Sequence, residues 1–348
     1  MTRELARRAW RPLSLCALAA RALGGVRSLE ARPPLTEPWE RSLPAAAPAS
    51  LGDTRLSYRE ANFLAAALVG RLAENRGIRA LVVKGSSLEH HGLRSGFVSA
   101  DVDVLVEPGR FHDLLLALLN AGWERRPSAE VDRLTRHHSV TLVNPRWPND
   151  IDLHPAFPGL LAGPTASFNV LWDHRERVML GGVPCWIPDR FAAIVIWALH
   201  SARGTARQPR HATEMRHLTD IVLPRLSEEE NHELAERIIA LGADAPLRAV
   251  DGFARIIGDL RGAQAPGAWV AWQGTVAQRH DVSPWQQALR EAPPRAWPWL
   301  IARAVWPSRQ DLKVLWPSAV DSPAGRLRAR LLRARRLMGR LLERNGTD

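Results

Sequence analysis

The stretch LVVKGSSLEHHGLRSGFVSADVDVLVEPG, residues 81–109, places Asp101 and Asp103 inside an apolar run. Residues 78–85 predict a buried strand that ends at glycine, and residues 101–109 predict a second strand. Side chains two residues apart on a strand point to the same face, so we expect the two carboxylates to project together, about 6.6 Å apart along the backbone. Neighbouring carboxylates in a partly buried setting cost free energy unless positive charge offsets them.

A divalent cation would supply that charge. No basic residue occurs in the six positions before Asp101, and Arg94 is the nearest on that side. Oxygen ligands favour Mg²⁺ or Mn²⁺. The segment NDIDLH, residues 149–154, offers Asp152 as a third acid, with Asp150 on the same strand face as the alternative. The other interpretation of the acid pair is a solvated strand end that binds nothing.

The residues before the acid pair predict a place for phosphate. Gly85, Ser86 and Ser87 close the first strand and open a short helix. Glycine permits close approach of the backbone, and free N–H groups at a helix start favour phosphate oxygens. Lys84 could also contact phosphate, although strand alternation could instead turn it away. A phosphate-binding turn beside three acids is typical of phosphoryl transfer, in which two metals about 4 Å apart clamp the reacting oxygens.

The surrounding pattern predicts an α+β fold with a small mixed sheet and helices on one face. A helix is expected over 57–75 and another over 110–122, and strands over 137–145 and 149–155 are expected to form a hairpin. After residue 188 the pattern becomes helical, and Ser227 with Glu230 predicts a capping box. The expected helices there are 189–202, 214–223, 227–242 and 245–260. Seven of the fourteen tryptophans occur in 265–320, where we expect them to fill gaps between helices.

The positive charge is concentrated at one end of the chain. Residues 324–348 hold eight arginines and two acids, which is +6 of the net +11. Leu327, Leu331, Leu337 and Leu341 form a stripe among these arginines. This tail could bind an acidic partner, a membrane surface or RNA, or it could be a solvated terminal helix packed by its leucines.

Cysteine and histidine usage gives no zinc pattern. Cys16 and Cys185 have no metal-binding spacing, and two lone cysteines favour a reducing, cytoplasmic location. The pairs His90-His91 and His137-His138 have no i,i+4 ligand partner, so surface or packing roles are expected. His154 shares a strand face with Asp152 and either orients a bound group or is structural. The apolar run 13–20 is short and ends at Arg21, which disfavours a signal peptide, and no apolar segment is long enough to span a membrane.

Three motifs together resemble a known family. KGSSL at 84–88, SADVDVLVEP at 99–108 and DIDLHP at 150–155 are similar to motifs of a bacterial nucleotidyltransferase family in the DNA polymerase β-like superfamily. The resemblance covers roughly residues 57–225. Two features depart from the superfamily pattern: the interval of 16 residues from Gly85 to Asp101 is longer than usual, and Arg94 lies further from the acid pair.

The resemblance implies an activity and a division of the chain. Asp101 and Asp103 would bind both metals, Asp152 would bind the catalytic metal and help to activate the acceptor hydroxyl, and Gly85 and Ser86 would hold the triphosphate. The expected activity is Mg²⁺- or Mn²⁺-dependent transfer of NMP, most simply AMP from ATP, to an acceptor hydroxyl or phosphate with release of pyrophosphate. The acceptor could be a peptide or protein, a small molecule or an RNA end. The alternative is a non-catalytic binding or scaffold protein that acts through its basic tail. The expected parts are an N-terminal helix and linker (1–50), a nucleotidyltransferase core (51–187), a helical, Trp-rich region (188–323) and an Arg-rich helix (324–348).

Overall fold

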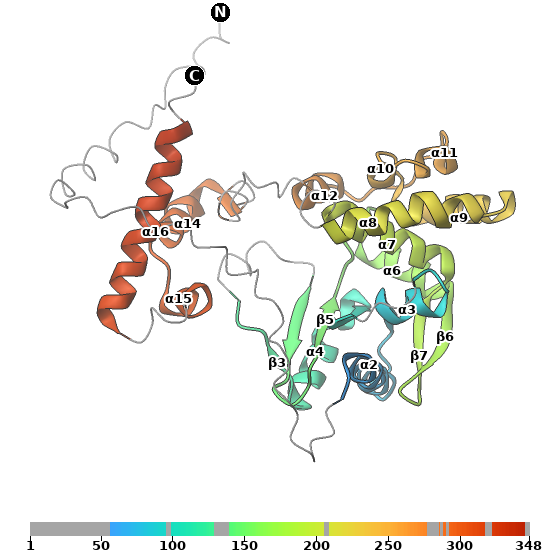
Figure 1. The fold of residues 1–348 in the computed structure, drawn as a ribbon, viewed down its shortest axis with the longest axis horizontal. Coiled ribbons are helices and arrows are strands. Elements are labelled where there is room, and N and C mark those ends of the chain that lie inside the picture. Colours follow the sequence, from blue (N-terminus) through green and yellow to red (C-terminus); the bar gives the residue numbers. More distant parts are fainter. Residues whose placement is uncertain are drawn as a thin grey trace, which may run out of the picture. The chain divides into compact units, whose positions relative to one another are not determined.

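The computed structural model describes residues 56–94, 99–128, 139–204, 209–276, 285, 288–289, 292–316 and 322–344. It contains a five-stranded sheet in the order β1-β2-β5-β4-β3, of which Figure 1 labels β3 and β5. The strands are β1 Ala80–Val83, β2 Asp101–Val106, β3 Glu124–Arg125, β4 Val140–Val143 and β5 Asp150–His154. Strands β2 and β5 pair in parallel, and the other pairs are antiparallel. The predicted mixed α+β fold and the hairpin of β4 with β5 are therefore confirmed.

One face of the sheet is covered by α2, Tyr58–Glu74, and α4, Phe111–Asn120. Helix α2 begins at a capping box formed by Ser57 and Glu60. Helix α4 buries its leucines against the sheet, and the 3-10 turn Pro108–Arg110 leads into it. The chain leaves α4 through Gly122, whose φ of 87° is the left-handed conformation expected after a helix.

The opposite face carries the predicted acids and shares a core with later helices. Leu81, Val83 and Leu105 belong to the same buried cluster as residues of α7, Arg190–Gly204. The short helix α3, Gly85–His90, follows β1 directly and contacts α7. Helix α6, Pro164–Asp173, adds Phe168 and Leu171 to this cluster. The end of the sheet that holds the acids is thus bordered by α3 and α7.

A second hairpin, β6 Arg175–Leu180 with β7 Val183–Pro188, was not predicted. Its two-residue turn is Gly181-Gly182, both with positive φ, which suits a tight hairpin turn. Strand β7 contacts β1 and α2, and burial there raises the pKa of the Cys185 thiol to about 11. A glycine pair between two six-residue strands is a hairpin signal that sequence reasoning can use.

The chain after residue 188 is helical, as predicted, with one correction. The expected helix over 245–260 is instead two short helices, because Gly252, with a φ of 84°, turns the chain between them. The capping box of Ser227 and Glu230 opens α9. The helices here are α8 Pro209–His217, continued by a π-helical turn Leu218–Val222 and a 3-10 turn Leu223–Arg225, then α9 Glu228–Ala240, α10 Asp244–Leu247, α11 Phe253–Ile257 and α12 Ala268–Val276.

The last part of the chain contains α14 Trp297–Val305, preceded by a 3-10 turn Pro294–Ala296, α15 Arg309–Leu315 and α16 Pro323–Arg344. The expectation that tryptophans fill gaps is wrong for several of them: Trp272 and Trp285 are buried, but Trp269, Trp297, Trp299 and Trp306 are 37–48% exposed.

The Arg-rich helix α16 packs differently from the expected leucine stripe. Leu327 and Leu331 are about half exposed, at 49% and 51%. Ala329 is buried instead, and Arg330 and Arg333 donate hydrogen bonds to the carbonyls of Pro307 and Ala304.

Several predictions fall outside the described residues: the helix and linker of 1–50, Cys16, the pair His137-His138, and the side chains of Leu337 and Leu341. In the part of the chain that is described, no helix combines the length and the hydropathy needed to cross a membrane.

The hairpin turn provides a test of the fold. Alanine at Gly181 or at Gly182 imposes the left-handed penalty of about 1–2 kcal/mol. Only at Gly181 would the new Cβ also meet backbone, the Phe63 carbonyl oxygen at 2.9 Å, whereas nothing lies within 4 Å at Gly182. We expect Gly181→Ala to lower the free energy of unfolding by about 1–3 kcal/mol more than Gly182→Ala, measured by urea denaturation. Equal losses would show that the turn does not rest on α2.

Candidate functional site

The register of β2 and β5 brings the predicted acids to one face. Asp103 pairs with Asp152, and Asp101 pairs with Asp150. Residues opposite each other on adjacent strands share a face, and so do residues two apart on one strand. The ligand atoms of Asp103, Asp152 and His154 lie within 4.8 Å of one another. Asp101 lies on the same face at the start of β2, outside this group of three.

Asp103 is the most strongly held of the acids. It is buried, its Oδ1 lies 2.6 Å from Lys84 Nζ, and the same oxygen accepts a hydrogen bond from His154 Nε2 at 3.0 Å. Burial alone would raise the pKa of Asp103, but the Lys84 ammonium and the His154 ring hold it well below its usual range. Asp103 therefore stays ionised at neutral pH.

Lys84 points into the site because its backbone breaks the strand pattern. It has φ 61° and ψ −148°, and within the described residues it is the one non-glycine with positive φ. Such conformations cost about 1–3 kcal/mol and persist only where the surroundings enforce them. Strand alternation had left its direction open; the structure turns its ammonium toward Asp103.

Asp152, not Asp150, joins Asp103. Asp150 forms an ion pair with Arg126 at the surface. Asp152 is mostly buried, and its Oδ1 has no hydrogen-bond partner among the described residues. Burial raises the pKa of Asp152, the charges of Asp103 and Asp101 add to that rise, and His154 and a hydrogen bond from Thr141 partly oppose it.

A surface pocket connects the acid pair to the predicted phosphate turn. Asp101 and Asp103 line it, together with Gly85, Ser86 and Ser99. Ser99 Oγ donates a hydrogen bond to Asp101 Oδ1 at 2.6 Å, which orients this carboxylate. Ser87, also predicted to bind phosphate, is fully buried and does not line the pocket, because the third residue of the short helix faces the core.

The charge balance differs from the one expected from sequence. Lys84, from the neighbouring strand end, already offsets part of the negative charge, so charge alone does not require a metal. Arg203 also interacts electrostatically with Asp103, but the three carboxylates on this face still outnumber these two cations. The buried, unpartnered Asp152 Oδ1 beside Asp103 also fits a hard cation, since oxygen donors are the ligands that Mg²⁺ and Mn²⁺ prefer.

Sequence reasoning missed Asn62, which lines the same pocket from α2. It is 7% exposed, its Nδ2 donates to the Ser99 carbonyl at 2.5 Å, and its Oδ1 has no partner among the described residues. The signal was present: Asn62 is a polar residue inside the apolar face that Ala61, Ala65 and Ala66 define.

A second polar cluster, His200, His211 and Glu214, lies on α7 and α8. Burial lowers the pKa of both histidines, and the charge of Lys84 contributes to each shift. Arg94 and Arg210 contact Glu214 Oε1 at 3.1 and 3.0 Å. Two arginines already neutralise this carboxylate, so Glu214 is a poor ligand for a metal. The cluster is better described as a structural ion-pair network than as a metal site.

Comparisons with known proteins leave the family open. No protein-family model matches the chain, and no curated protein matches its sequence. A solved structure of the antibiotic-resistance factor ANT(2'')-Ia is similar over 56% of this chain and 97% of its own, at 13% identity and a TM-score of 0.36. A tRNA-processing enzyme in an apo form is similar over 82% and 81%, at 14% identity and a TM-score of 0.25. Scores this low support no argument about function, so the resemblance of the motifs stays a prediction.

The ion pair of Lys84 with Asp103 can be tested by stability. Lys84→Met leaves a buried carboxylate without its cation, and we expect a loss of about 3–5 kcal/mol. The low pKa of Asp103 stabilises the fold above the unfolded value of about 3.9, and this contribution is lost as the pH falls toward the folded pKa. The difference between wild type and variant should therefore shrink below about pH 4, as measured by urea unfolding across pH.

Lys313→Met is the matched control, since Lys313 is the other lysine of the chain and is exposed on α15. It should change stability by less than about 0.5 kcal/mol. A Lys84→Met variant as stable as this control would contradict the buried ion pair.

Proposed function

We propose that the protein is a metal-dependent nucleotidyltransferase that moves NMP, most simply AMP from ATP, to an acceptor and releases pyrophosphate. One observation supports this most strongly: the buried carboxylate of Asp103 and the partly buried one of Asp152 lie in register on adjacent parallel strands, and the pocket that Asp101 and Asp103 line includes the Gly85-Ser86 turn. Acids and a phosphate-binding turn in one place are what transfer of a nucleotide requires.

Each part of the site has a role in this proposal. Asp101, Asp103 and Asp152 hold Mg²⁺ or Mn²⁺, which neutralises charge on the triphosphate when bound. The backbone at Gly85 and Ser86 approaches the phosphates, with no large side chain in the way. Lys84 immediately precedes this turn. Its ammonium group, which is ion-paired with Asp103, can instead form an ion pair with a phosphate oxygen when nucleotide binds. Asn62, with a free acceptor in the pocket, can orient a hydroxyl of the nucleotide or the acceptor.

The reaction is a displacement at the α-phosphorus. A bond forms between the acceptor oxygen and phosphorus, the bond from phosphorus to the bridging oxygen breaks, and pyrophosphate leaves with the electron pair. Asp152 helps to activate the acceptor hydroxyl by accepting its proton as this bond forms. The acceptor class stays open among a peptide or protein, a small molecule and an RNA end.

Three substitutions test the proposal with an internal control. Asp101→Asn, Asp103→Asn and Asp152→Asn should each lower transfer of label from α-labelled ATP, in the presence of Mg²⁺, by at least about 10²-fold. Asp150→Asn should keep near wild-type activity, because Asp150 is paired with Arg126 and lies outside the group of ligands. The assay offers peptide, small-molecule and RNA acceptors in parallel and follows release of labelled product.

The alternative is a binding protein that acts through the Arg-rich helix α16. It predicts no nucleotide binding and no transfer to any acceptor class, together with binding to an acidic partner that is lost when residues 324–348 are deleted. This pattern of results would reject the enzymatic proposal.

A further inference from the structure

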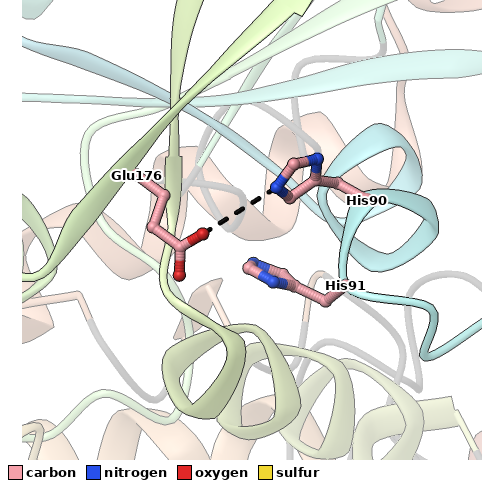
Figure 2. Close-up of side chains that lie close together, drawn as sticks. All are labelled: His90, His91 and Glu176. Carbon is pink, nitrogen blue, oxygen red and sulfur yellow. Dashed lines mark ion pairs between the residues drawn. The ribbon is translucent and has the colours of Figure 1, made fainter.

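A second candidate metal site lies at the other end of α3, away from the Gly85-Ser86 turn. His90 is the last residue of this helix and His91 is its C-cap, and Glu176 reaches them from β6 (Figure 2). The ligand atoms of the three side chains all lie within 4.8 Å of one another. His90 Nε2 is 3.8 Å from Glu176 Oε2, and the two imidazole rings are 5.2 Å apart between centroids.

We propose that His90, His91 and Glu176 bind one transition-metal ion, best represented by Zn²⁺. Two imidazoles and one carboxylate are a donor set that Zn²⁺ uses, with a fourth position left for water. In a tetrahedral zinc site neighbouring ligand atoms are about 3.4 Å apart. The ligand atoms therefore need to approach one another by about 1.4 Å at most, from 4.8 to 3.4 Å. The side chains of His90 and Glu176 are 39% and 45% exposed, so packing does not enclose them.

A hydrogen bond at Nε2 of His91 leaves Nδ1 as the nitrogen that could bind the metal. Its Nε2 lies 2.9 Å from the Pro188 carbonyl oxygen, which can only accept a hydrogen bond. The proton of the neutral ring is therefore on Nε2, and the lone pair is on Nδ1. A histidine that donates one N–H to a carbonyl while the other nitrogen binds metal is the usual outer-shell arrangement of metal-binding histidines.

Strand alternation turns the two arginines beside Glu176 in sequence away from its carboxylate. Its neighbours Arg175 and Arg177 point to the other face of the hairpin. Their guanidinium groups stack over Trp186, at 4.6 and 5.7 Å from the ring centroid, and Arg175 also stacks over Trp172 at 4.3 Å. Neither of these two arginines therefore neutralises the carboxylate of Glu176, which can bind a cation. This differs from Glu214 in the other histidine cluster, which two arginines already contact.

The site would join α3 to the β6–β7 hairpin. The hydrogen bond from His91 to Pro188 already connects the end of α3 to the end of β7. A metal bound to Glu176 would add a second connection, to β6. This ion would therefore be separate from the Mg²⁺ of the proposed transferase site and would act on the fold around the phosphate turn.

The test is a titration of the full, tag-free chain with Zn²⁺ alone, by calorimetry, and with Co²⁺ alone, by visible absorption. We expect one equivalent of Zn²⁺ to bind and the Co²⁺ spectrum to show a tetrahedral or five-coordinate site. His90→Ala, His91→Ala and Glu176→Gln should each weaken Zn²⁺ binding by at least ~10-fold. Zn²⁺ should also raise the melting temperature of wild type but not of the His90→Ala/His91→Ala variant.

The matched control is His232→Ala. His232 and Glu236 on α9 form an exposed histidine–carboxylate pair with an even shorter separation, 3.3 Å, but they belong to no group of three potential ligands among the described residues. This variant should bind Zn²⁺ as wild type does. The proposal is overturned if wild type binds no Zn²⁺, or if the His90→Ala/His91→Ala variant binds it with unchanged affinity.

Discussion

The buried carboxylate of Asp103 is stabilised by side chains from the two neighbouring strands, so the positions of these strands are constrained together. An ionised carboxylate is stable in a protein interior only when cations or hydrogen-bond donors surround it. Lys84 and His154 provide these on one oxygen, and they come from the ends of the two strands that flank β2. The order β1-β2-β5 therefore places both partners of Asp103 beside it, in addition to burying the apolar side chains of the sheet.

Lys84 shows how far the local structure adapts to this constraint. A residue continuing the alternation of β1 would point its side chain away from Asp103, whereas the positive φ of Lys84 turns it inward. The strain costs about 1–3 kcal/mol, which a buried ion pair can offset because losing one partner costs more than that. Strain at a chemically active position is a common feature of functional sites, and it supports a role for Lys84 beyond packing.

Helix α3 has an unusual position between two groups of polar side chains. Its first residues border the pocket with Asp101 and Asp103, and its last residues carry the two histidines near Glu176. A helix of six residues has little stability of its own. Its position therefore depends on the contacts at both of its ends.

Much of this protein could be predicted from sequence, since local patterns carry the necessary information. The strand of Asp101 and Asp103 follows from apolar residues that alternate with acids, and the end of α4 follows from Gly122. What the sequence alone could not determine is which side chains from distant segments meet. The choice of Asp152 over Asp150 depends on Arg126, the direction of Lys84 depends on a strained backbone, and Glu176 reaches His90 only because of the β6–β7 hairpin. These are contacts between residues far apart in the chain, and only tertiary packing decides them.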